Sequence, residues 1–187
     1  MAKAVPTITD AYQLLHHGTL VMSEMEANGI HVDTAYIEQA QQKIQQRIDE
    51  LTKELEQDKI FARWKKAFGS KTKLGSRSQL AHVLFTIMNI PTESKTSTRY
   101  AADADVLEDV NLPFTKKYIE CEKLKKAKNT YLANILRETV DGVIHPNFDL
   151  NTARTYRSSS SNPNFQNIPM RDPLVKELIR KAFVARK

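Results

Sequence analysis

Residues 154–171 combine the side chains that bind phosphate groups and the edges of nucleic-acid bases. The segment reads RTYRSSSSNPNFQNIPMR, and its arginines are Arg154, Arg157 and Arg171. Arginine pairs with phosphate oxygens, and both arginine and carboxamide side chains can donate hydrogen bonds to base edges. The carboxamides are Asn164, Gln166 and Asn167. Four consecutive serines are also typical of a polar linker, so composition leaves two interpretations open, a linker and a nucleic-acid contact.

The net charge of +6 is unevenly distributed along the 187 residues. Residues 1–60 carry five more acidic than basic residues, whereas residues 61–130 carry seven more basic than acidic residues. Residues 131–187 carry four more basic than acidic residues. This asymmetry indicates a polyanionic partner that contacts two separate regions. A solvated surface with uneven charge is the alternative.

The sequence lacks the residue patterns of several familiar catalytic and metal-binding sites. The five histidines show no metal-ligand spacing with cysteine or acidic residues. There is no phosphate-binding loop, no nucleophile elbow and no close carboxylate pair that would hold two metal ions. Cys121 is predicted to pack within an apolar helix stripe, and a single cysteine excludes an internal disulfide. We therefore expect no complete active site, no catalytic residue and no metal site in this chain.

Two long helices must position these residues. The first is predicted over residues 34–57, with Asp33 as its N-cap, because it carries a narrow apolar seam on a polar helix. The seam residues are Ile37, Ile44, Ile48, Leu51 and Leu55. The second helix is predicted from Pro113 to about Val140, and Asp141-Gly142 then gives a turn signal. A narrow seam packs against one partner, so we expect an antiparallel pair that projects from a body.

Shorter elements flank these helices. A helix is predicted over residues 8–28, with an apolar face formed by Leu14, Leu15, Val21, Met22 and Met25. Residues 69–77 form a basic loop, followed by a short helix to Met88 that Ser76 or Ser78 would cap, and residues 92–101 form an exposed loop. Another short helix is expected around residues 106–107. Short strands are expected at residues 143–145 and 147–150, a helix from Pro173 and a strand from Phe183. The fold class is therefore mainly α with a small β part, α+β.

The polar segment resembles a motif of DNA polymerase I-type (family A) enzymes, T-x-R-x-S-S-x-x-P-N-L-Q-N-I-P, followed by an arginine and a helix that ends in A-F. The matching positions are Thr155, Arg157, Ser159, Ser160, Pro163, Asn164, Gln166, Asn167, Ile168, Pro169 and Arg171, with AFVA at 182–185. Residues 142–145 (GVIH), 125–131 (KKAKNTY), 75–80 (GSRSQL) and 22–33 resemble other segments of that family. The resemblance therefore covers nearly the whole chain.

The resemblance implies a thumb at residues 34–139, with residues 1–33 and 140–187 as parts of an incomplete palm. It also implies that this chain holds primer-template DNA. Thumb-tip residues would hold phosphates, helix lysines would contact the duplex backbone, and the polar segment would lie in the minor groove beside the primer end. The thumb-tip residues are Lys71, Lys73, Ser76 and Arg77, and the helix lysines are Lys126 and Lys128. The residues of the polar segment are Arg157, Asn164, Gln166 and Asn167, flanked by Arg154 and Arg171. For each lysine, a solvated surface position remains an equal alternative.

The sequence also departs from the family. Tyr156 stands where glycine is usual, Asn162 where aspartate is common and Phe165 where leucine is common. In the family, the first metal-binding aspartate follows shortly after the A-F-V-A strand, whereas this sequence stops at Lys187. The resemblance therefore implies that the chain alone adds no nucleotide and has no cofactor of its own. Mg²⁺ would enter only with a second polypeptide that carries the remaining palm and fingers.

Several explanations for this arrangement remain open. Three explanations fit: a split-gene polymerase, for example of a phage; a truncated gene product; and an expressed fragment. The chain could instead be a stand-alone DNA-binding module, or a helical protein-interaction protein whose basic loop is incidental. The sequence has neither a secretory signal nor a membrane-spanning run, so we expect a cytoplasmic location, in a bacterial or phage-infected cell.

Overall fold

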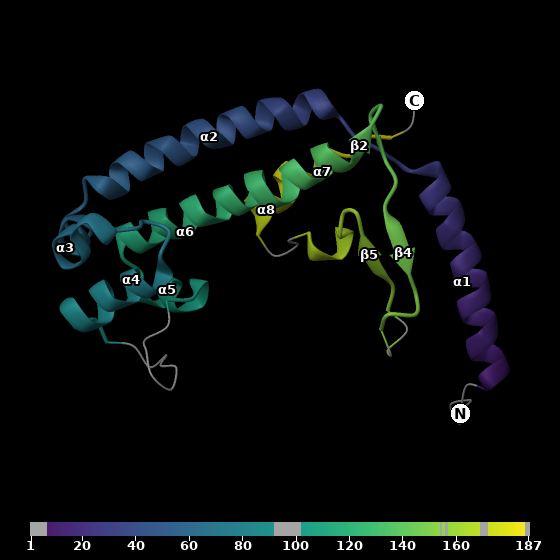
Figure 1. The fold of residues 1–187 in the computed structure, drawn as a ribbon, viewed down its shortest axis with the longest axis horizontal. Coiled ribbons are helices and arrows are strands. Elements are labelled where there is room, and N and C mark those ends of the chain that lie inside the picture. The colour runs from purple at the N-terminus through teal and green to yellow at the C-terminus, as the bar shows by residue number, and fades with distance from the viewer. Residues whose placement is uncertain (1–6, 92–101, 154, 156, 169–171, 186–187) are drawn as a thin grey trace. The chain divides into compact units, whose positions relative to one another are not determined.

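The computed structural model describes residues 7–91, 102–153, 155, 157–168 and 172–185. Within these residues the fold is mainly helical with small antiparallel sheets (Figure 1), which confirms the predicted fold class. The chain divides into two compact units. Residues 42–128 form one unit, and residues 1–41 together with 129–187 form the other. The predicted loop at 92–101 lies outside the described residues.

The unit of residues 42–128 is built on two long helices. Helix α2 spans Thr34–Glu56 and α6 spans Pro113–Lys126. Arg47 donates a hydrogen bond to Glu120 at 3.0 Å, and Lys117 pairs with Glu54 at 2.8 Å. Later positions on α2 therefore meet earlier positions on α6, which confirms the antiparallel pairing (Figure 1).

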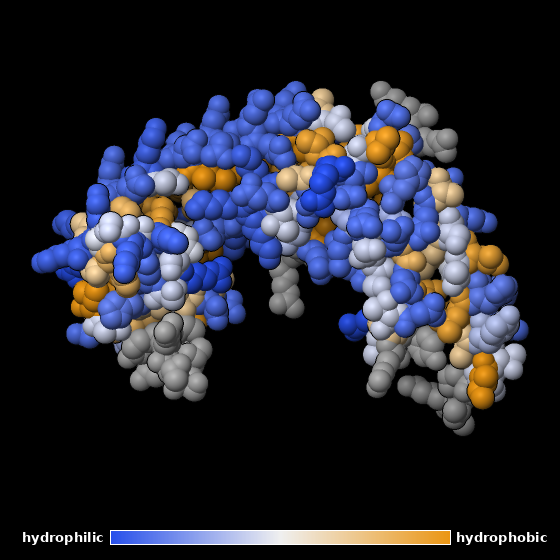
Figure 2. All heavy atoms as spheres, in the orientation of Figure 1, coloured by the Kyte–Doolittle hydropathy of each residue, from blue (hydrophilic) through white to orange (hydrophobic). Residues whose placement is uncertain are grey.

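The predicted seam of α2 is buried. In this unit Ile44, Ile48, Leu51 and Leu55 are at most 6% exposed. The surface that α2 presents in Figure 2 is mostly hydrophilic, as a seam on a polar helix requires. Because one narrow stripe is apolar, burial of that stripe accounts for most of the hydrophobic stabilisation of α2.

Shorter helices complete this unit. They are α3 (Lys59–Phe68), the 3₁₀ turn η1 (Gly69–Lys71), α4 (Arg77–Ala81), the π-helical η2 (His82–Ile87) and α5 (Ala104–Val110). The predicted short helices near residues 78–88 and 106–107 are confirmed, whereas the sequence analysis missed α3. Asp58 begins α3 by accepting a hydrogen bond from the Ile60 nitrogen at 2.7 Å. The fully buried side chains of the unit include Trp64, Leu80, Leu84, Leu107 and Phe114.

The second long helix is not uniform. Helix α6 continues into the π-helical η3 (Ala127–Leu132) and then into α7 (Ala133–Glu138). The second helix was predicted to end near Val140, but it ends at Glu138, because Thr139–Val140 forms strand β2. Both residues are β-branched, and they pair with a neighbouring strand instead of continuing the helix.

In the unit that contains both chain ends, a three-stranded antiparallel sheet has the order β1-β3-β2. Strand β1 is Ile30–His31 and β3 is Val143–Ile144. Asp141 and Gly142 join β2 to β3 with φ of 50° and 75°, the left-handed pair that a two-residue hairpin turn needs. The predicted turn is thus confirmed.

Helix α8 (Pro173–Arg180) packs in the same unit. Val175 and Ile179 are buried, and the Leu178 carbonyl accepts a hydrogen bond from the Tyr36 hydroxyl at 3.1 Å. Asp33 caps α2 as predicted, with its Oδ1 2.8 Å from the Tyr36 nitrogen. The strand expected from Phe183 is reduced to a single bridge with Val32.

Helix α1 (Ile8–Asn28) has the predicted bounds. Of its predicted apolar face, Leu15 and Met22 are half-buried, whereas Leu14, Val21 and Met25 are 60%, 56% and 49% exposed, and Figure 2 shows hydrophobic surface over α1. On the packed side Gly18 meets Leu150, whose Cδ1 would lie 2.6 Å from any Cβ at position 18. The predicted apolar face is thus confirmed for Leu15 and Met22 and wrong for the other three residues. No helix among the described residues is long and apolar enough to cross a membrane.

Tyr118 gives a prediction about stability at alkaline pH. It is 2% exposed, its hydroxyl has no hydrogen-bond partner among the described residues, and burial raises its pKa from 10.0 to about 12. A folded-state pKa above the unfolded value means that this contribution to stability is complete below pH 10 and is lost as pH rises towards 12. We expect Tyr118 to titrate late in an ultraviolet absorbance titration.

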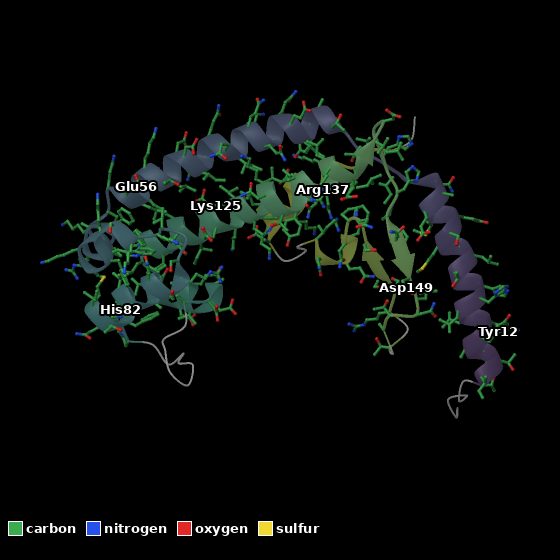
Figure 3. All side chains as sticks on the ribbon, viewed as in Figure 1. Tyr12, Glu56, His82, Lys125, Arg137 and Asp149 are labelled. Carbon is green, nitrogen blue, oxygen red and sulfur yellow. The ribbon has the colours of Figure 1, made fainter. Side chains whose placement is uncertain are left out.

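Tyr118→Phe should remove that late titration and raise the free energy of unfolding at neutral pH by up to about 1 kcal/mol, because an unsatisfied buried hydroxyl is removed. Chemical denaturation measures this change. Tyr12→Phe is the matched control, since Tyr12 is 65% exposed on α1 (Figure 3). Loss of the late titration in Tyr12→Phe instead would contradict the assignment.

Candidate nucleic-acid interface

The serine-rich part of the polar segment is a strand. Strand β5 (Ser159–Ser161) pairs antiparallel with β4 (Asn147–Asp149), with Phe148 opposite Ser160. Ser160 is only 5% exposed, and its hydroxyl accepts a hydrogen bond from the Phe165 nitrogen at 2.9 Å. The linker interpretation of these serines is therefore wrong, because they pair in a sheet and support the turn that follows.

That turn is held by its own side chains. The 3₁₀ helix η4 spans Phe165–Asn167, and Asn164 caps it through a 3.0 Å hydrogen bond from the Gln166 nitrogen to Asn164 Oδ1. The Gln166 amide group donates to Ser158, to its hydroxyl at 3.1 Å and to its carbonyl oxygen. The Phe165 ring packs edge-on against the Phe183 ring, with centroids 5.5 Å apart. Local hydrogen bonds thus define the backbone of this segment, whose regular structure is limited to the three-residue strand β5 and the 3₁₀ turn η4.

A hollow of about 130 Å³ lies beside this turn. Asn164 and Asn167 line it from one side, and Thr130, Tyr131 and Asn134 line it from the helix formed by η3 and α7. The sequence analysis missed Thr130 and Asn134 as candidates. Their spacing of four residues puts both on one helical face, but only the packing of the turn reveals which face. The hollow therefore gathers hydroxyl and carboxamide groups from two parts of the chain.

Arg157 is exposed immediately before β5. The turn after β4, at the position of Asp149 in Figure 3, is closed by hydrogen bonds from the Thr152 hydroxyl and the Asn151 nitrogen. These two hydrogen bonds lower the pKa of Asp149. Arg154 and Arg171 lie outside the described residues. Of the three predicted arginines, Arg157 is thus the one whose position is described.

The thumb-tip candidates lie together in the unit of residues 42–128. Lys71 ends η1, Lys73 follows it, and both are exposed. Ser76 caps α4, with its hydroxyl accepting a hydrogen bond from the Gln79 nitrogen at 3.4 Å. Arg77 is the first residue of α4 and pairs with Asp103 at 3.8 Å. The predicted cap at Ser76 is confirmed.

The helix lysines lie further along the same unit. Lys126 is exposed at the end of α6, and Lys128 lies in η3. The Lys128 ammonium donates to Gln45 Oε1 at 2.5 Å, and Gln45 Nε2 donates to Asp49 Oδ1 at 2.8 Å. Gln45 was missed by the sequence analysis, because its role depends on the pairing of α2 with the second helix. The Lys128 side chain is therefore held in place by α2.

A magnesium ion does not fit the side chains described. Over residues 7–91, 102–153, 155, 157–168 and 172–185, no three His, Cys, Asp or Glu side chains come together as metal ligands. We therefore derive no chemical step through a metal ion. What the described geometry offers is a set of hydrogen-bond donors and cations, which suits binding to an anion-rich polymer.

Comparison with known proteins identifies the class to which this arrangement belongs. The family model described as DNA polymerase family A matches residues 34–187. The thermostable DNA polymerase I of Thermus thermophilus is 34% identical over 171 residues, which cover 88% of this chain and 19% of that protein. DNA polymerase I of Lactococcus lactis subsp. cremoris is 32% identical over 167 residues, 88% of this chain and 18% of that protein.

A solved structure has the same fold. The POL domain of Pol1 from M. smegmatis, in complex with DNA primer-template and dNTP, superposes with a TM-score of 0.74 and 32% sequence identity. The match covers 89% of this chain and 28% of that chain. Fold and sequence thus place the chain among DNA polymerases. It belongs to DNA polymerase family A, and it spans about a fifth of the length of the curated relatives it matches.

Ser160→Ala tests how the polar segment is held. Removing the hydroxyl leaves the Phe165 nitrogen without its acceptor, so we expect the free energy of unfolding to fall by about 1–2 kcal/mol in chemical denaturation. Ser161→Ala is the matched control, because Ser161 is exposed in the same strand, and its effect should stay within about 0.5 kcal/mol. Equal effects of the two substitutions would show that the Ser160 hydroxyl does not support the turn.

Proposed function

We propose that this chain holds primer-template DNA as part of a family A DNA polymerase. The observation that carries the proposal is the turn at residues 158–168. Its backbone is held by Ser158, Ser160 and Asn164, while Asn164 and Asn167 line a hollow with helix residues. The M. smegmatis domain of similar fold was solved with DNA primer-template, which supports the same ligand here.

In this proposal the polar segment lies along the minor groove near the primer end. Minor-groove acceptors are nearly the same for all base pairs, so carboxamides and an arginine there sense pair geometry without reading sequence. Arg157 is exposed and Asn167 faces the hollow, so both are available to a ligand. The Gln166 amide group already bonds to Ser158, so we assign it a part in shaping the segment as well as in contacting DNA.

We further assign residues 34–139 to the thumb and residues 1–33 and 140–187 to the palm. Lys71, Lys73 and Arg77 would bind duplex phosphates, and the Ser76 hydroxyl would join them from the cap of α4. Lys126 and Lys128 would contact the backbone from the second long helix. Such contacts are independent of sequence and depend on salt, as phosphate neutralisation requires.

Nucleotide addition is proposed to need residues beyond these 187. Phosphoryl transfer by two metal ions requires a cluster of carboxylates, and none is present among the described side chains. We propose that a second polypeptide, or further residues of the same protein, supplies the remaining palm and fingers with Mg²⁺. A split phage gene is one source that this proposal allows.

Two other functions compete with this one. A stand-alone DNA-binding module would bind duplex DNA and need no completing polypeptide. A helical interaction protein would show no DNA affinity at low salt. The family match over residues 34–187 favours the polymerase function, because it includes both the basic helices and the polar segment.

Arg157→Ala tests the contact at the primer end. We expect affinity for a primer-template duplex to fall by about tenfold in fluorescence anisotropy, because one cationic donor is lost from the groove. Arg137→Ala is the matched control. It removes an equal charge from an exposed arginine on α7 (Figure 3) that pairs with Glu138 at 2.9 Å, and it should leave affinity within about twofold. Equal losses in both variants would mean that net charge alone governs binding.

Primer extension tests the need for completion. The 187-residue polypeptide with dNTPs and magnesium should bind primer-template but yield no extended product, because the described side chains include no carboxylate cluster for two metal ions. Adding a polypeptide with the remaining palm and fingers of a family A polymerase should restore synthesis, measured by gel electrophoresis of a labelled primer. Extension by the 187 residues alone would refute the requirement. Failure of the pair to bind primer-template would refute the proposed function itself.

A further inference from the structure

The side chain of Gln79, on α4, forms hydrogen bonds with three residues that precede it. Its Oε1 accepts from the indole Nε1 of Trp64 at 2.9 Å and from the main-chain nitrogen of Lys73 at 3.0 Å. Its Nε2 donates to the main-chain carbonyl of Lys71 at 2.9 Å. One carboxamide thus links a buried tryptophan to the segment that carries Lys71 and Lys73.

The pattern of donors and acceptors matches a glutamine. A carboxamide oxygen has two lone pairs, and both face N–H groups here, while the NH₂ group faces a carbonyl. A glutamate could accept the two hydrogen bonds but could not donate to the Lys71 carbonyl. A leucine of similar size would provide none of the three. The network therefore determines both the residue type and the orientation of its amide.

Gln79 is anchored on the side away from the loop. Trp64 and Leu80 are 0% exposed, so the residue that Gln79 binds and the residue that follows it both lie in the core of this unit. The Gln79 main-chain nitrogen also bonds to the Ser76 hydroxyl. A carboxamide attached in this way has little freedom to move, and groups that bind it are held relative to the core.

Within the basic loop, residues 69–76 form few other hydrogen bonds that reach outside the loop. Thr72 bonds back to the Gly69 carbonyl through its nitrogen at 3.2 Å and its hydroxyl at 2.7 Å, and the Ser76 nitrogen bonds to the Lys73 carbonyl at 2.9 Å. These bonds close single turns within the loop. A Cβ added at Gly69 or Gly75 would meet no atom within 4 Å, so neither glycine is packed against the unit.

We infer that Gln79 is a positioning residue that fixes the backbone of the basic loop and so presents Lys71 and Lys73 to duplex phosphates. This inference rests on the proposed function. Lysine side chains are long and flexible, so their placement depends on where the backbone is held. Ordering the loop before DNA arrives reduces the entropy that binding must otherwise lose. Gln79 acts on DNA binding through the two lysines and does not itself contact DNA.

In the absence of DNA, the rate of trypsin cleavage after Lys71 and Lys73 measures how firmly the loop backbone is held. In the full 187-residue chain, Gln79→Leu should be cleaved there about tenfold faster than the unaltered chain, because both loop bonds are lost and the open state is more populated. Gln46→Leu is the matched control, since Gln46 is exposed on α2 in the same unit, and its cleavage there should stay within about twofold. Gln79→Glu should be intermediate. Cleavage of Gln79→Leu at the unaltered rate would overturn the inference.

A double-mutant comparison separates positioning from general stability. Gln79→Leu should weaken binding to a primer-template duplex by about threefold to tenfold in the unaltered chain. It should cause no further loss in a Lys71→Ala/Lys73→Ala background, because the lysines through which it acts are gone. Equal losses in both backgrounds would assign Gln79 a structural role only. Absence of duplex binding by the unaltered chain would refute the proposed function, while the cleavage rates would still judge the hold on the loop.

Discussion

Buried and half-buried N–H groups need hydrogen-bond acceptors, and in this chain single polar side chains supply two of them. The Phe165 nitrogen, beyond the end of β5, bonds to the Ser160 hydroxyl, and the buried Trp64 indole bonds to the Gln79 carboxamide. Both acceptors have polar neighbours, since Ser160 lies in a strand of three serines and Gln79 follows residues 75–78. Apolar packing also contributes nearby, through the Phe165 and Phe183 rings and the buried Leu80. In the proposed function, the polar side chains would thus help to shape the surface that contacts DNA.

The unit of residues 42–128 depends on a different balance. Its helices α2 and α6 bury a narrow apolar seam, while the ion pairs between them, such as Arg47 with Glu120, are largely exposed. Exposed ion pairs stabilise a protein by at most about 1 kcal/mol each, so apolar burial holds the helices together and the charges mainly select their register. Because only one stripe of α2 is apolar, the rest of its surface can carry charge without loss of packing. A basic surface and a stable pair of helices are therefore compatible in one short sequence.

Sequence patterns predicted the elements whose packing follows from periodicity. The seam from Ile44 to Leu55 fixed α2, and Asp141-Gly142 fixed the β2–β3 turn through backbone conformation alone. Patterns failed where one residue's neighbours decide the outcome. The packed side of α1 includes Gly18, which has no side chain to mark it, so the apolar residues identified only Leu15 and Met22 of that side correctly. Helix α3 was missed although its signal is present, because Phe61, Trp64 and Phe68 stand at helical spacing after the Asp58 cap. The hollow beside Asn167 required residues from a distant helix, which spacing cannot reveal.

The lysines illustrate two ways of placing a flexible cation. Lys128 is held at its ammonium, which donates to Gln45, whereas Lys71 and Lys73 are held at their backbone through Gln79. An ammonium has three donors, so Lys128 can keep Gln45 and still offer two hydrogen bonds to a phosphate. The Lys128 side chain would then lose little additional conformational freedom when it binds a phosphate, but its ammonium can reach only one place. In the proposed function, the side chains of Lys71 and Lys73 would adapt to the duplex, at a greater cost in side-chain entropy for each contact. Lys128 would then supply a fixed contact and the loop lysines adaptable ones within a single unit.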